Sequence, residues 1–320
     1  MLLSEIEPYL YSIDVFGNLT QWAINDNTVE NRLGKIFDSI VTIMLISSYQ
    51  KNLLYVAGRN GHLITYNTAK LALEKDFGQI HRGAIYSMVM TSKKTAQRLV
   101  TCGKDKTLKL WDVKSNPGQL LETYKFVSKS NILSMCFGAN DRFLFCGTEN
   151  GSILQYKLYQ SGKSLQQISE ITGAHREAIN CIVVSKKDDF LFTSGDDCCL
   201  RQWAVVNRQN FMICSKNLYH EVKSHHKESV RNLKVCGDYL FSSGDDRSIK
   251  KWSIGEKKIK YCIEGAHSDW VLSMDILPNG QVLFSSGEDK CLKIWCVETG
   301  NLILDLGEIH ENTVQGIAIK

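Results

Sequence analysis

Short runs of apolar residues, separated by polar turns, recur along the whole chain and are typical of β-strands. One run is Ile179–Val184, and a second, Phe190–Thr193, follows it after a few polar residues. The second run leads into a turn rich in Gly and Asp, and a third run ends on an aromatic residue. A fourth, more variable segment closes the unit. Since no stretch keeps a helical period, the pattern predicts an all-β protein.

This unit repeats. Four decapeptides share one plan, a small residue and Gly, then an acidic or basic residue and Asp, and finally Trp: 102–111, 194–203, 243–252 and 286–295. Weaker copies end at Tyr66, Tyr156 and Trp22. The closing aromatics are spaced by 43 to 49 residues, and they are Trp22, Tyr66, Trp111, Tyr156, Trp203, Trp252 and Trp295.

A period of about 40–45 residues with four strands per unit is the signature of a β-propeller. The chain resembles the WD-repeat β-propeller family along its whole length, although Trp111-Asp112 is its one literal Trp-Asp pair. The resemblance implies a single seven-bladed propeller with four antiparallel strands per blade, occupying residues 1–320.

The two termini are expected to complete one blade together. Residues 8–23 match the second and third strands of a unit, residues 29–37 supply the fourth, and the segment from His310 supplies the first. Blade 7 is therefore predicted to combine residues 1–37 with 308–320. Blades 1 to 6 are numbered in chain order by their closing aromatics, from Tyr66 in blade 1 to Trp295 in blade 6. Such pairing removes strand edges that would otherwise be open.

Three polar residues recur at fixed positions around most of the closing aromatics. A His lies four residues before the first apolar residue of the first strand, a Ser or Thr ten residues before the aromatic, and an Asp six residues before it. The complete quartets are His81, Thr101, Asp105 and Trp111; His175, Thr193, Asp197 and Trp203; His226, Ser242, Asp246 and Trp252; and His267, Ser285, Asp289 and Trp295.

Ser, His and Asp together suggest a catalytic triad, but four copies of one active site in a chain of 320 residues favour a structural role. The family resemblance implies a buried hydrogen-bonded chain from Asp through His and Ser/Thr to Trp. Three blades depart from it. Blade 1 has Val56 and Asn60 and no His. Blade 3 has Cys146, Asn150 and Ser128. Blade 7 has His310, Ser12 and Trp22, but Phe16 where Asp belongs, which predicts an incomplete network.

Other catalytic and ligand-binding motifs fail on spacing. Gly162-Lys163-Ser164 lacks the upstream Gly of a phosphate-binding loop, and His220-Glu221 lacks the second His of a metalloprotease helix. A metal site built from His220, His225 and His226 remains a minor alternative. The paired Cys198-Cys199 and the pair Cys291 and Cys296 lack zinc spacing and are assigned to the third strand of their blades. We therefore predict no catalytic residues, no cofactor and no metal.

Composition agrees with a protein that folds inside the cell. The chain is 43% hydrophobic and 22% charged, carries a net charge of +4 and has eleven cysteines, an odd number. No basic region precedes an apolar segment at the N-terminus, and the longest uncharged apolar run, Ser39–Gln50, is too short to span a membrane. We expect a cytoplasmic or nuclear protein that does not enter a membrane.

The family resemblance places binding on the loops that lead into the first strand and on the turns between the second and third strands. Apart from the quartet Asp residues, those loops carry nine cations, Arg59, Arg82, Lys104, Lys106, Lys129, Arg176, Lys227, Arg247 and Lys290, and eight anions, Glu149, Glu177, Asp196, Glu228, Asp245, Asp269, Glu288 and Glu311. This near balance favours a solvated rim of mixed charge over a nucleic-acid face. It leaves open a local cluster, since Arg82, Lys104 and Lys106 come from one blade and Arg59 from its neighbour.

Two aromatic residues on the same loops are candidate interface anchors. Trp270 stands where other blades have Ala84, Asn131, Ala178, Ser229 or Thr313, and Phe16 replaces the turn Asp. The alternative is that both rings pack over the channel mouth. A third candidate surface is the insertion at 207–220, which carries Phe211, Met212 and Tyr219.

Together these features predict a non-catalytic scaffold that binds partner proteins, itself monomeric within a larger complex. One alternative is a substrate-recognition subunit of a ubiquitin ligase or similar complex. The other is an RNA-associated or ribosome-associated propeller, a class that the charge balance disfavours.

Overall fold

The computed structural model describes residues 9–24, 28–47, 50, 52–92, 97–114, 118–125, 130–138, 140–159, 163–208, 211–222 and 226–319, with the backbone alone at 28–29 and 206–222. Within these ranges the regular structure consists of 28 β-strands and no helix. Consequently no described segment forms a helix that could cross a membrane. Apolar and polar residues alternate at the strand period in this sequence, which accounts for the all-β fold.

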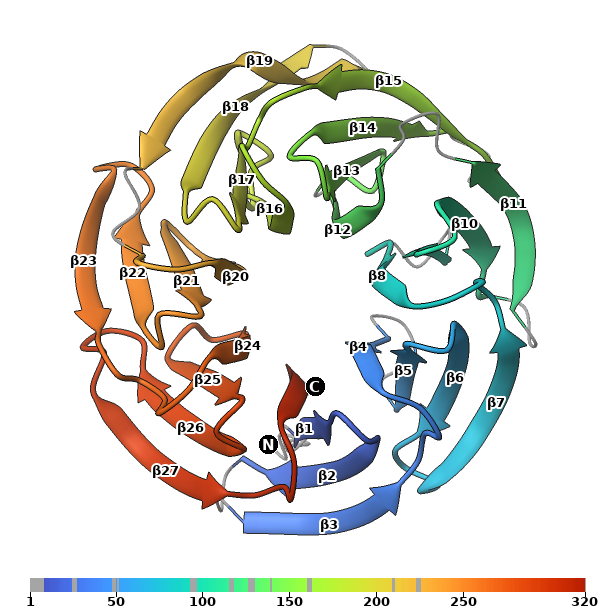
Figure 1. Ribbon diagram of the computed structural model, residues 1–320, viewed down its shortest axis with the longest axis vertical. Helices are drawn as coiled ribbons and strands as arrows, with labels where there is room; N and C mark the ends of the chain where they lie inside the picture. The colour runs from blue at the N-terminus through green and yellow to red at the C-terminus, as the bar shows by residue number, and fades with distance from the viewer. Residues whose placement is uncertain are drawn as a thin grey trace, which may run out of the picture.

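The strands form seven four-stranded antiparallel sheets arranged as blades in a closed ring (Figure 1). Residues of the innermost strands line a central channel. Within each blade we call the strands A to D from the channel outward. Blades 1 to 3 consist of β4 (Val41–Ile46), β5 (Leu53–Gly58), β6 (His62–Asn67) and β7 (Ala72–Gln79); β8 (Ile85–Met90), β9 (Arg98–Gly103), β10 (Thr107–Asp112) and β11 (Gln119–Lys125); and β12 (Ile132–Phe137), β13 (Phe143–Thr148), β14 (Ile153–Leu158) and β15 (Leu165–Ile171).

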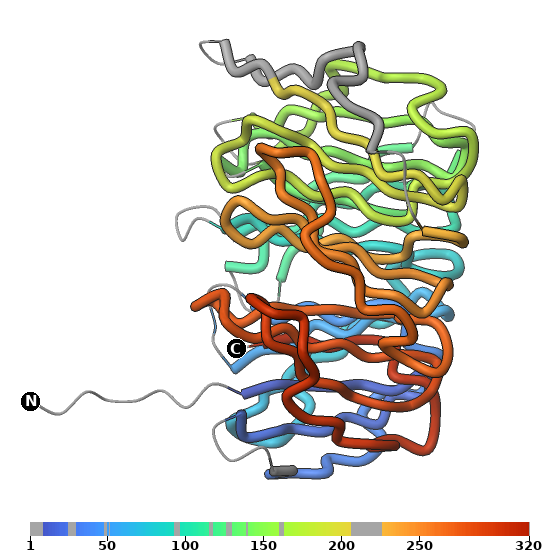
Figure 2. Tube along the Cα trace, turned by 90° about the vertical axis from the view of Figure 1, so that its left-hand side faces the viewer, coloured from blue at the N-terminus to red at the C-terminus, as the bar shows by residue number. Residues whose placement is uncertain are grey.

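Blades 4 to 6 continue the same order. They consist of β16 (Ile179–Val184), β17 (Phe190–Gly195), β18 (Leu200–Arg208) and β19 (Phe211–Val222); β20 (Val230–Cys236), β21 (Tyr239–Gly244), β22 (Ile249–Ser253) and β23 (Lys258–Ile263); and β24 (Val271–Ile276), β25 (Val282–Gly287), β26 (Cys291–Cys296) and β27 (Leu302–Glu308). Seen edge-on, the blades form a thick disc (Figure 2).

Blade 7 is composite, as the sequence predicts. Its strand A is β28 (Val314–Ile319), and its other strands are β1 (Tyr9–Asp14), β2 (Asn18–Ala23) and β3 (Thr28–Lys35). Strand β28 pairs antiparallel with β1, with Tyr11 opposite Ala318. Blade 6 holds the same strand from its other side, because Asp275 accepts a hydrogen bond from the backbone N–H of Ile319 at 3.2 Å.

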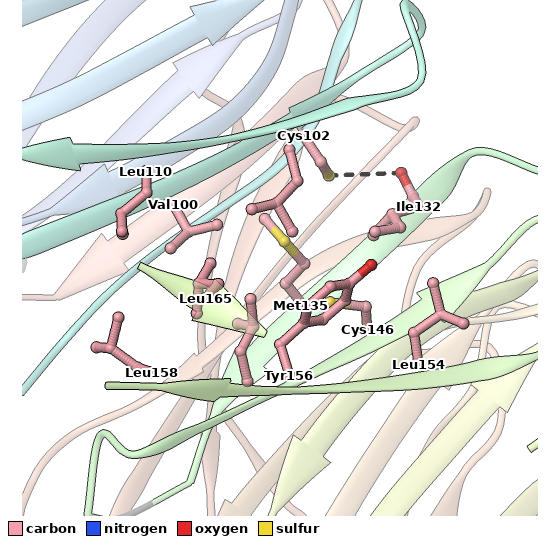
Figure 3. Close-up of a cluster of buried hydrophobic side chains, with 12 residues drawn as sticks. Val100, Cys102, Leu110, Ile132, Met135, Cys146, Leu154, Tyr156, Leu158 and Leu165 are labelled. Atoms are coloured by element: carbon pink, nitrogen blue, oxygen red, sulfur yellow. Dashed lines mark hydrogen bonds between the residues drawn. The ribbon is translucent and has the colours of Figure 1, made fainter. Parts of the chain in front are cut away.

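The core lies between neighbouring blades, where apolar side chains from facing sheets meet. The B strands β5, β9 and β13 are buried along their whole length, whereas the D strand β7 is largely exposed. Figure 3 shows the cluster between blades 2 and 3, in which Met135 and Tyr156 lie near Cys102 and Cys146. There the Sγ of Cys102 lies 3.4 Å from the carbonyl oxygen of Ile132 in the next blade.

The turns between strands B and C are built alike in different blades. In each of these turns a residue one or two positions before strand C adopts a left-handed conformation. Its φ is 58° at Lys106 and Cys198, 61° at Arg247 and 81° at Gly61. Cys198 and Cys199 therefore lie in this turn, and their assignment to strand C was wrong. The Gly-Asp sequence favours the turn geometry over strand extension.

The insertion in blade 4 lengthens a hairpin. Strands β18 and β19 have 9 and 12 residues and stay paired as far as Arg208 opposite Phe211. The segment that carries Phe211, Met212 and Tyr219 is thus a long outer strand, while the side chains of these residues fall outside the described part of the structure.

Removing residues 308–320 deletes β28 together with His310. We expect the melting temperature to fall and the transition to broaden, because β1 loses one of its two neighbouring strands and blade 6 loses the hydrogen bond at Asp275. Differential scanning calorimetry measures this, and a synthetic peptide of residues 308–320 should restore part of the loss. A truncated chain that melts at the full-length temperature would contradict the role of β28 in ring closure.

Candidate functional site

The polar residues of blade 2 form one buried hydrogen-bonded chain. The Nε1–H of Trp111 donates to the Oγ1 of Thr101 at 3.1 Å, and Thr101 lies 2.9 Å from the Nε2 of His81. The Nδ1 of His81 lies 2.9 Å from the carboxylate of Asp105. These contacts are all satisfied when Thr101 donates to Nε2 and Nδ1–H donates to Asp105, which assigns the neutral histidine tautomer.

The quartets of blades 4, 5 and 6 have the same geometry. Their His Nδ1 atoms lie 2.8 to 3.0 Å from the Asp carboxylates, and their Nε2 atoms lie 2.7 Å from the hydroxyls of Thr193, Ser242 and Ser285. The Nε1–H groups of Trp203, Trp252 and Trp295 donate to these same hydroxyls at 2.8 to 2.9 Å. The four histidines are buried, being 1% to 5% exposed, so a solvent-facing reaction centre does not fit them.

The quartet carboxylates also position the loops that join one blade to the next. The second oxygen of Asp105 accepts a hydrogen bond from the backbone N–H of Arg82 at 3.0 Å, the residue directly after His81. Asp197, Asp246 and Asp289 accept the corresponding bonds from Arg176, Lys227 and Ser268 at 3.0 to 3.2 Å. Each D–A loop is thereby tied to a B–C turn. These loops and turns lie on the same face of the ring, which we call the top face.

Burial and hydrogen bonding set the charge states of these groups. Burial opposes ionisation of Asp105, but hydrogen bonds from His81, Arg82 and Thr107 outweigh it and lower the pKa of that carboxyl. Burial lowers the pKa of His81 despite the neighbouring carboxylate. The arrangement at physiological pH is therefore a neutral imidazole donating to an anionic carboxylate.

Cations four residues after the Asp strengthen two of the quartets, a feature that the sequence analysis missed. The Nη1 of Arg201 lies 2.6 Å from Asp197, and the Nζ of Lys250 lies 3.1 Å from Asp246. Burial opposes ionisation of both carboxyls, yet hydrogen bonds from His175 and His226 and these cations hold their pKa values well below the usual range. The sequence carries a signal for it, because an Arg or Lys stands two residues before the closing Trp in all four quartet blades, at Lys109, Arg201, Lys250 and Lys293.

In blade 7 a different carboxylate stands near the histidine. Ser12 lies 2.8 Å from the Nε2 of His310 and accepts from the Nε1–H of Trp22 at 2.9 Å. Asp14 is buried, but its Oδ2 is 3.9 Å from the Nδ1 of His310, which is too long for a hydrogen bond. Asp14 instead accepts from the backbone N–H groups of Phe16 and Asn18. No repeat position marks Asp14 in the sequence, because this residue lies at the end of strand β1 and two residues before the place of the quartet Asp.

Blades 1 and 3 use local contacts in place of the quartet. In blade 1 the side chain of Asn60 accepts from the backbone N–H of His62 at 3.1 Å. In blade 3 the hydroxyl of Thr148 donates to Asn150 at 2.6 Å, and Ser130 accepts from the backbone N–H of Asn150 at 3.0 Å. Ser128, which the sequence suggested for this place, lies outside the described residues.

Trp270 is a large exposed aromatic side chain on the top face at the mouth of the channel. Trp270 is 42% exposed and lines the channel, which has a volume of about 890 Å³. The guanidinium carbon of Arg231 lies 5.6 Å from the centroid of its ring. Arg231 in turn donates to both carboxylate oxygens of Asp245 at 2.8 and 2.6 Å. This ion pair raises the pKa of Arg231, against its partial burial.

The other candidate residues are distributed over separate parts of the top face. Phe16 is 51% exposed in the B–C turn of blade 7. Arg247 is exposed in blade 5, where its Nη1 lies 3.5 Å from the carbonyl oxygen of Ser268. Arg59, Arg82, Lys104 and Lys106 are exposed on adjoining loops of blades 1 and 2. Lys129 and His225 lie outside the described residues. In the described part, no group of three metal-binding side chains is close enough to hold an ion.

Comparison with known proteins identifies the family. The model of the WD domain, G-beta repeat, matches residues 78–112, 165–204, 216–253 and 258–296. The matched stretches end at or just after the Trp residues of blades 2, 4, 5 and 6, the blades with complete quartets. Seven four-stranded blades and these repeats define a WD-repeat propeller. The chain belongs to this family, whose propellers are generally non-catalytic scaffolds that mediate protein interactions.

The sequence matches to known relatives cover only parts of the chain. WD repeat-containing protein 18 of Danio rerio is 31% identical over 119 residues, which are 35% of this chain and 27% of that protein. Autophagy-related protein 16 of Arabidopsis thaliana is 28% identical over 187 residues, covering 55% of this chain and 32% of the relative. The chain thus spans about a third or less of these relatives. A crystal structure of the computationally designed Ika8 protein superimposes with a TM-score of 0.70 at 20% identity, covering 96% of this chain and 86% of that one, and supports the fold alone.

The hydrogen-bonded chain gives a sharp test in two adjacent serines. Ser242 and Ser243 are both fully buried, but Ser242 joins His226 to Trp252, whereas the hydroxyl of Ser243 has no partner among the described residues. Ser242→Ala leaves two buried groups unpaired and should lower the free energy of unfolding by about 2–3 kcal/mol. Ser243→Ala serves as the control and should change it by well under 1 kcal/mol. Equal losses in urea denaturation would contradict this assignment.

The buried histidines make stability depend on pH. The pKa of His81 and of His310 is lowered by burial in the folded chain, so the unfolded chain binds more protons in acid. The free energy of unfolding should therefore be highest above about pH 6.5 and fall as the pH drops toward about 5. Urea denaturation across this range measures the slope, and His310→Gln should make it shallower. A stability that is constant or rises between those pH values would contradict the neutral state of the histidines.

Proposed function

We propose that this chain is a non-catalytic platform that holds partner proteins in a complex, and that the top face is the surface where they bind. The observation that carries the proposal is the exposed indole of Trp270, which is held at the channel mouth by Arg231. Large aromatic side chains are the residues that most often anchor protein interfaces.

The ring of Trp270 is prepared for contact before any partner arrives. Asp245 fixes Arg231 with two hydrogen bonds, and Arg231 lies against the ring. A ring already held in place loses little conformational freedom on binding, so more of its contact energy contributes to affinity. Trp270 also lies only three residues after His267 in the loop between blades 5 and 6. The hydrogen bond from His267 to Asp289 fixes this loop to blade 6.

The proposed platform binds a protein partner and converts no substrate. The Ser/Thr, His and Asp side chains that resemble a triad are buried and hydrogen-bonded to one another, as His81 is to Thr101. The Asp side chain also binds the backbone of the neighbouring loop, as Asp105 does at Arg82. We place the platform in the cytoplasm or nucleus as a single propeller within a larger assembly.

Trp270→Ala should weaken partner binding and leave the melting temperature within about 2 °C of the parent, since exposed substitutions far from a packed core change stability little. Proximity labelling with quantitative mass spectrometry compares the variant with the parent. Leu302→Ala is the matched control, because Leu302 is 48% exposed on the outer strand β27, away from the top face. We expect a set of proteins lost from Trp270→Ala and retained by Leu302→Ala. Recovery of the same proteins at the same levels from all three chains would refute the proposal.

A further inference from the structure

Seven equivalent residues encircle the channel mouth on the top face. In every blade, the backbone N–H of the residue after strand B donates to the carbonyl of the residue before strand A, at 2.8 to 3.0 Å. The repetition of this bond places all seven side chains at the same position of their blades. We call this set the mouth ring, and in blade order it consists of Arg59, Lys104, Glu149, Asp196, Asp245, Glu288 and Val15.

Charge is segregated around the mouth ring. Blades 1 and 2 contribute the cations Arg59 and Lys104, whereas the four consecutive blades 3 to 6 contribute acidic residues. The near balance of charge in the sequence conceals this separation, because a sum over loops ignores their order around the ring. Opposite charges on two sides of one opening create a field that steers a charged ligand to one side.

The loops around the two cations add further positive charge. In blade 1, a Cβ placed on Gly61 would lie 2.0 Å from the carbonyl oxygen of His81, so the turn after Arg59 packs directly against the loop that carries Arg82. That loop in turn contacts blade 2, because Arg82 N–H donates to Asp105 and Lys104 N–H donates to the carbonyl of Ala84. Arg59, Arg82, Lys104 and Lys106 therefore form one continuous surface, which we call the basic patch.

Acidic residues near the basic patch have other partners. Asp105 is held by His81, Thr107 and the N–H of Arg82, and Glu149 accepts from the side chain of Asn131 at 2.8 Å. Among the described residues, Arg59, Arg82 and Lys104 form no ion pair. Their charge is available to a ligand.

We propose that the basic patch binds a short acidic peptide segment of a partner protein. The inference deepens the proposed function and rests on it, since it names the chemistry of a partner on the top face. The acidic side chains of blades 3, 4 and 6 repel such a segment, so they confine it to blades 1 and 2 and set its position, whereas Asp245 of blade 5 is already paired with Arg231.

The extent of the patch favours a peptide over RNA. The patch occupies two neighbouring blades and ends at Glu149 on one side and at Val15 on the other. A nucleic-acid backbone carries regularly spaced charge, and its affinity grows with the number of phosphates neutralised. A strand extending past blade 2 would meet Glu149 and the acidic residues beyond it, whereas a few carboxylates fit within the patch.

The test uses the full chain and a fluorescein-labelled hexaglutamate peptide, followed by fluorescence anisotropy at low ionic strength. The patch variant is Arg82→Glu with Lys106→Glu. The control variant is Arg176→Glu with Arg247→Glu, which makes the same change of charge. Arg176 matches Arg82 because both follow a quartet His and donate to its Asp, and Arg247 matches Lys106 because both occupy the left-handed position of a B–C turn. Thermal unfolding checks that each variant folds.

We expect the patch variant to bind hexaglutamate about tenfold more weakly than the parent, and the control variant to stay within about twofold. Trp270→Ala should bind the peptide like the parent. The inference is overturned if the parent does not bind, or if both double variants lose affinity equally, which would indicate an effect of net charge. It is also overturned if single-stranded oligouridylate binds the parent more tightly than hexaglutamate does and the patch variant alone loses affinity for oligouridylate. In each of these cases, loss of partners from Trp270→Ala in proximity labelling would still support the proposed function.

Discussion

The hydrogen bond between a buried histidine and an aspartate is the contact on which the top face of this propeller depends. It secures a D–A loop to a B–C turn, and the second carboxylate oxygen fixes the backbone of the next residue, as Asp105 does for Arg82. Because a buried donor or acceptor without a partner costs free energy, each quartet is strongly held to one arrangement. The exposed residues that follow each histidine are thus displayed on rigid loops.

This anchoring differs among the blades, and the differences follow from single residues. Arg201 and Lys250 add a cation to the quartets of blades 4 and 5, while Asp14 approaches His310 in blade 7 without a hydrogen bond. Among the five blades that carry this histidine, the weakest link from histidine to carboxylate therefore lies in the blade that joins both ends of the chain. There, backbone pairing of β28 with β1 and the bond from Ile319 to Asp275 hold the blade together.

The two candidate contact regions of the top face have different physical characters. Trp270 offers apolar area beside an arginine that an aspartate already neutralises, so it is suited to close packing. The basic patch offers solvated charge whose attraction reaches over roughly a Debye length, about 8–10 Å, and falls in high salt. A partner that uses both would be steered by one region and retained by the other.

The strands, the seven blades and the four complete quartets are predictable from the sequence alone, because they depend on short, regular spacings along the chain. The sequence also indicated the composite blade, since the missing first strand had one source, the segment after His310. It could not determine that Cys198 and Cys199 lie in a turn, that Arg231 stacks on Trp270, or that Asp14 stands near His310. Those relations join residues of different loops or blades, and closure of the ring decides which loops meet. The same reason explains the charges: their sum is a property of the sequence, whereas their separation into a basic and an acidic side is a property of the closed ring.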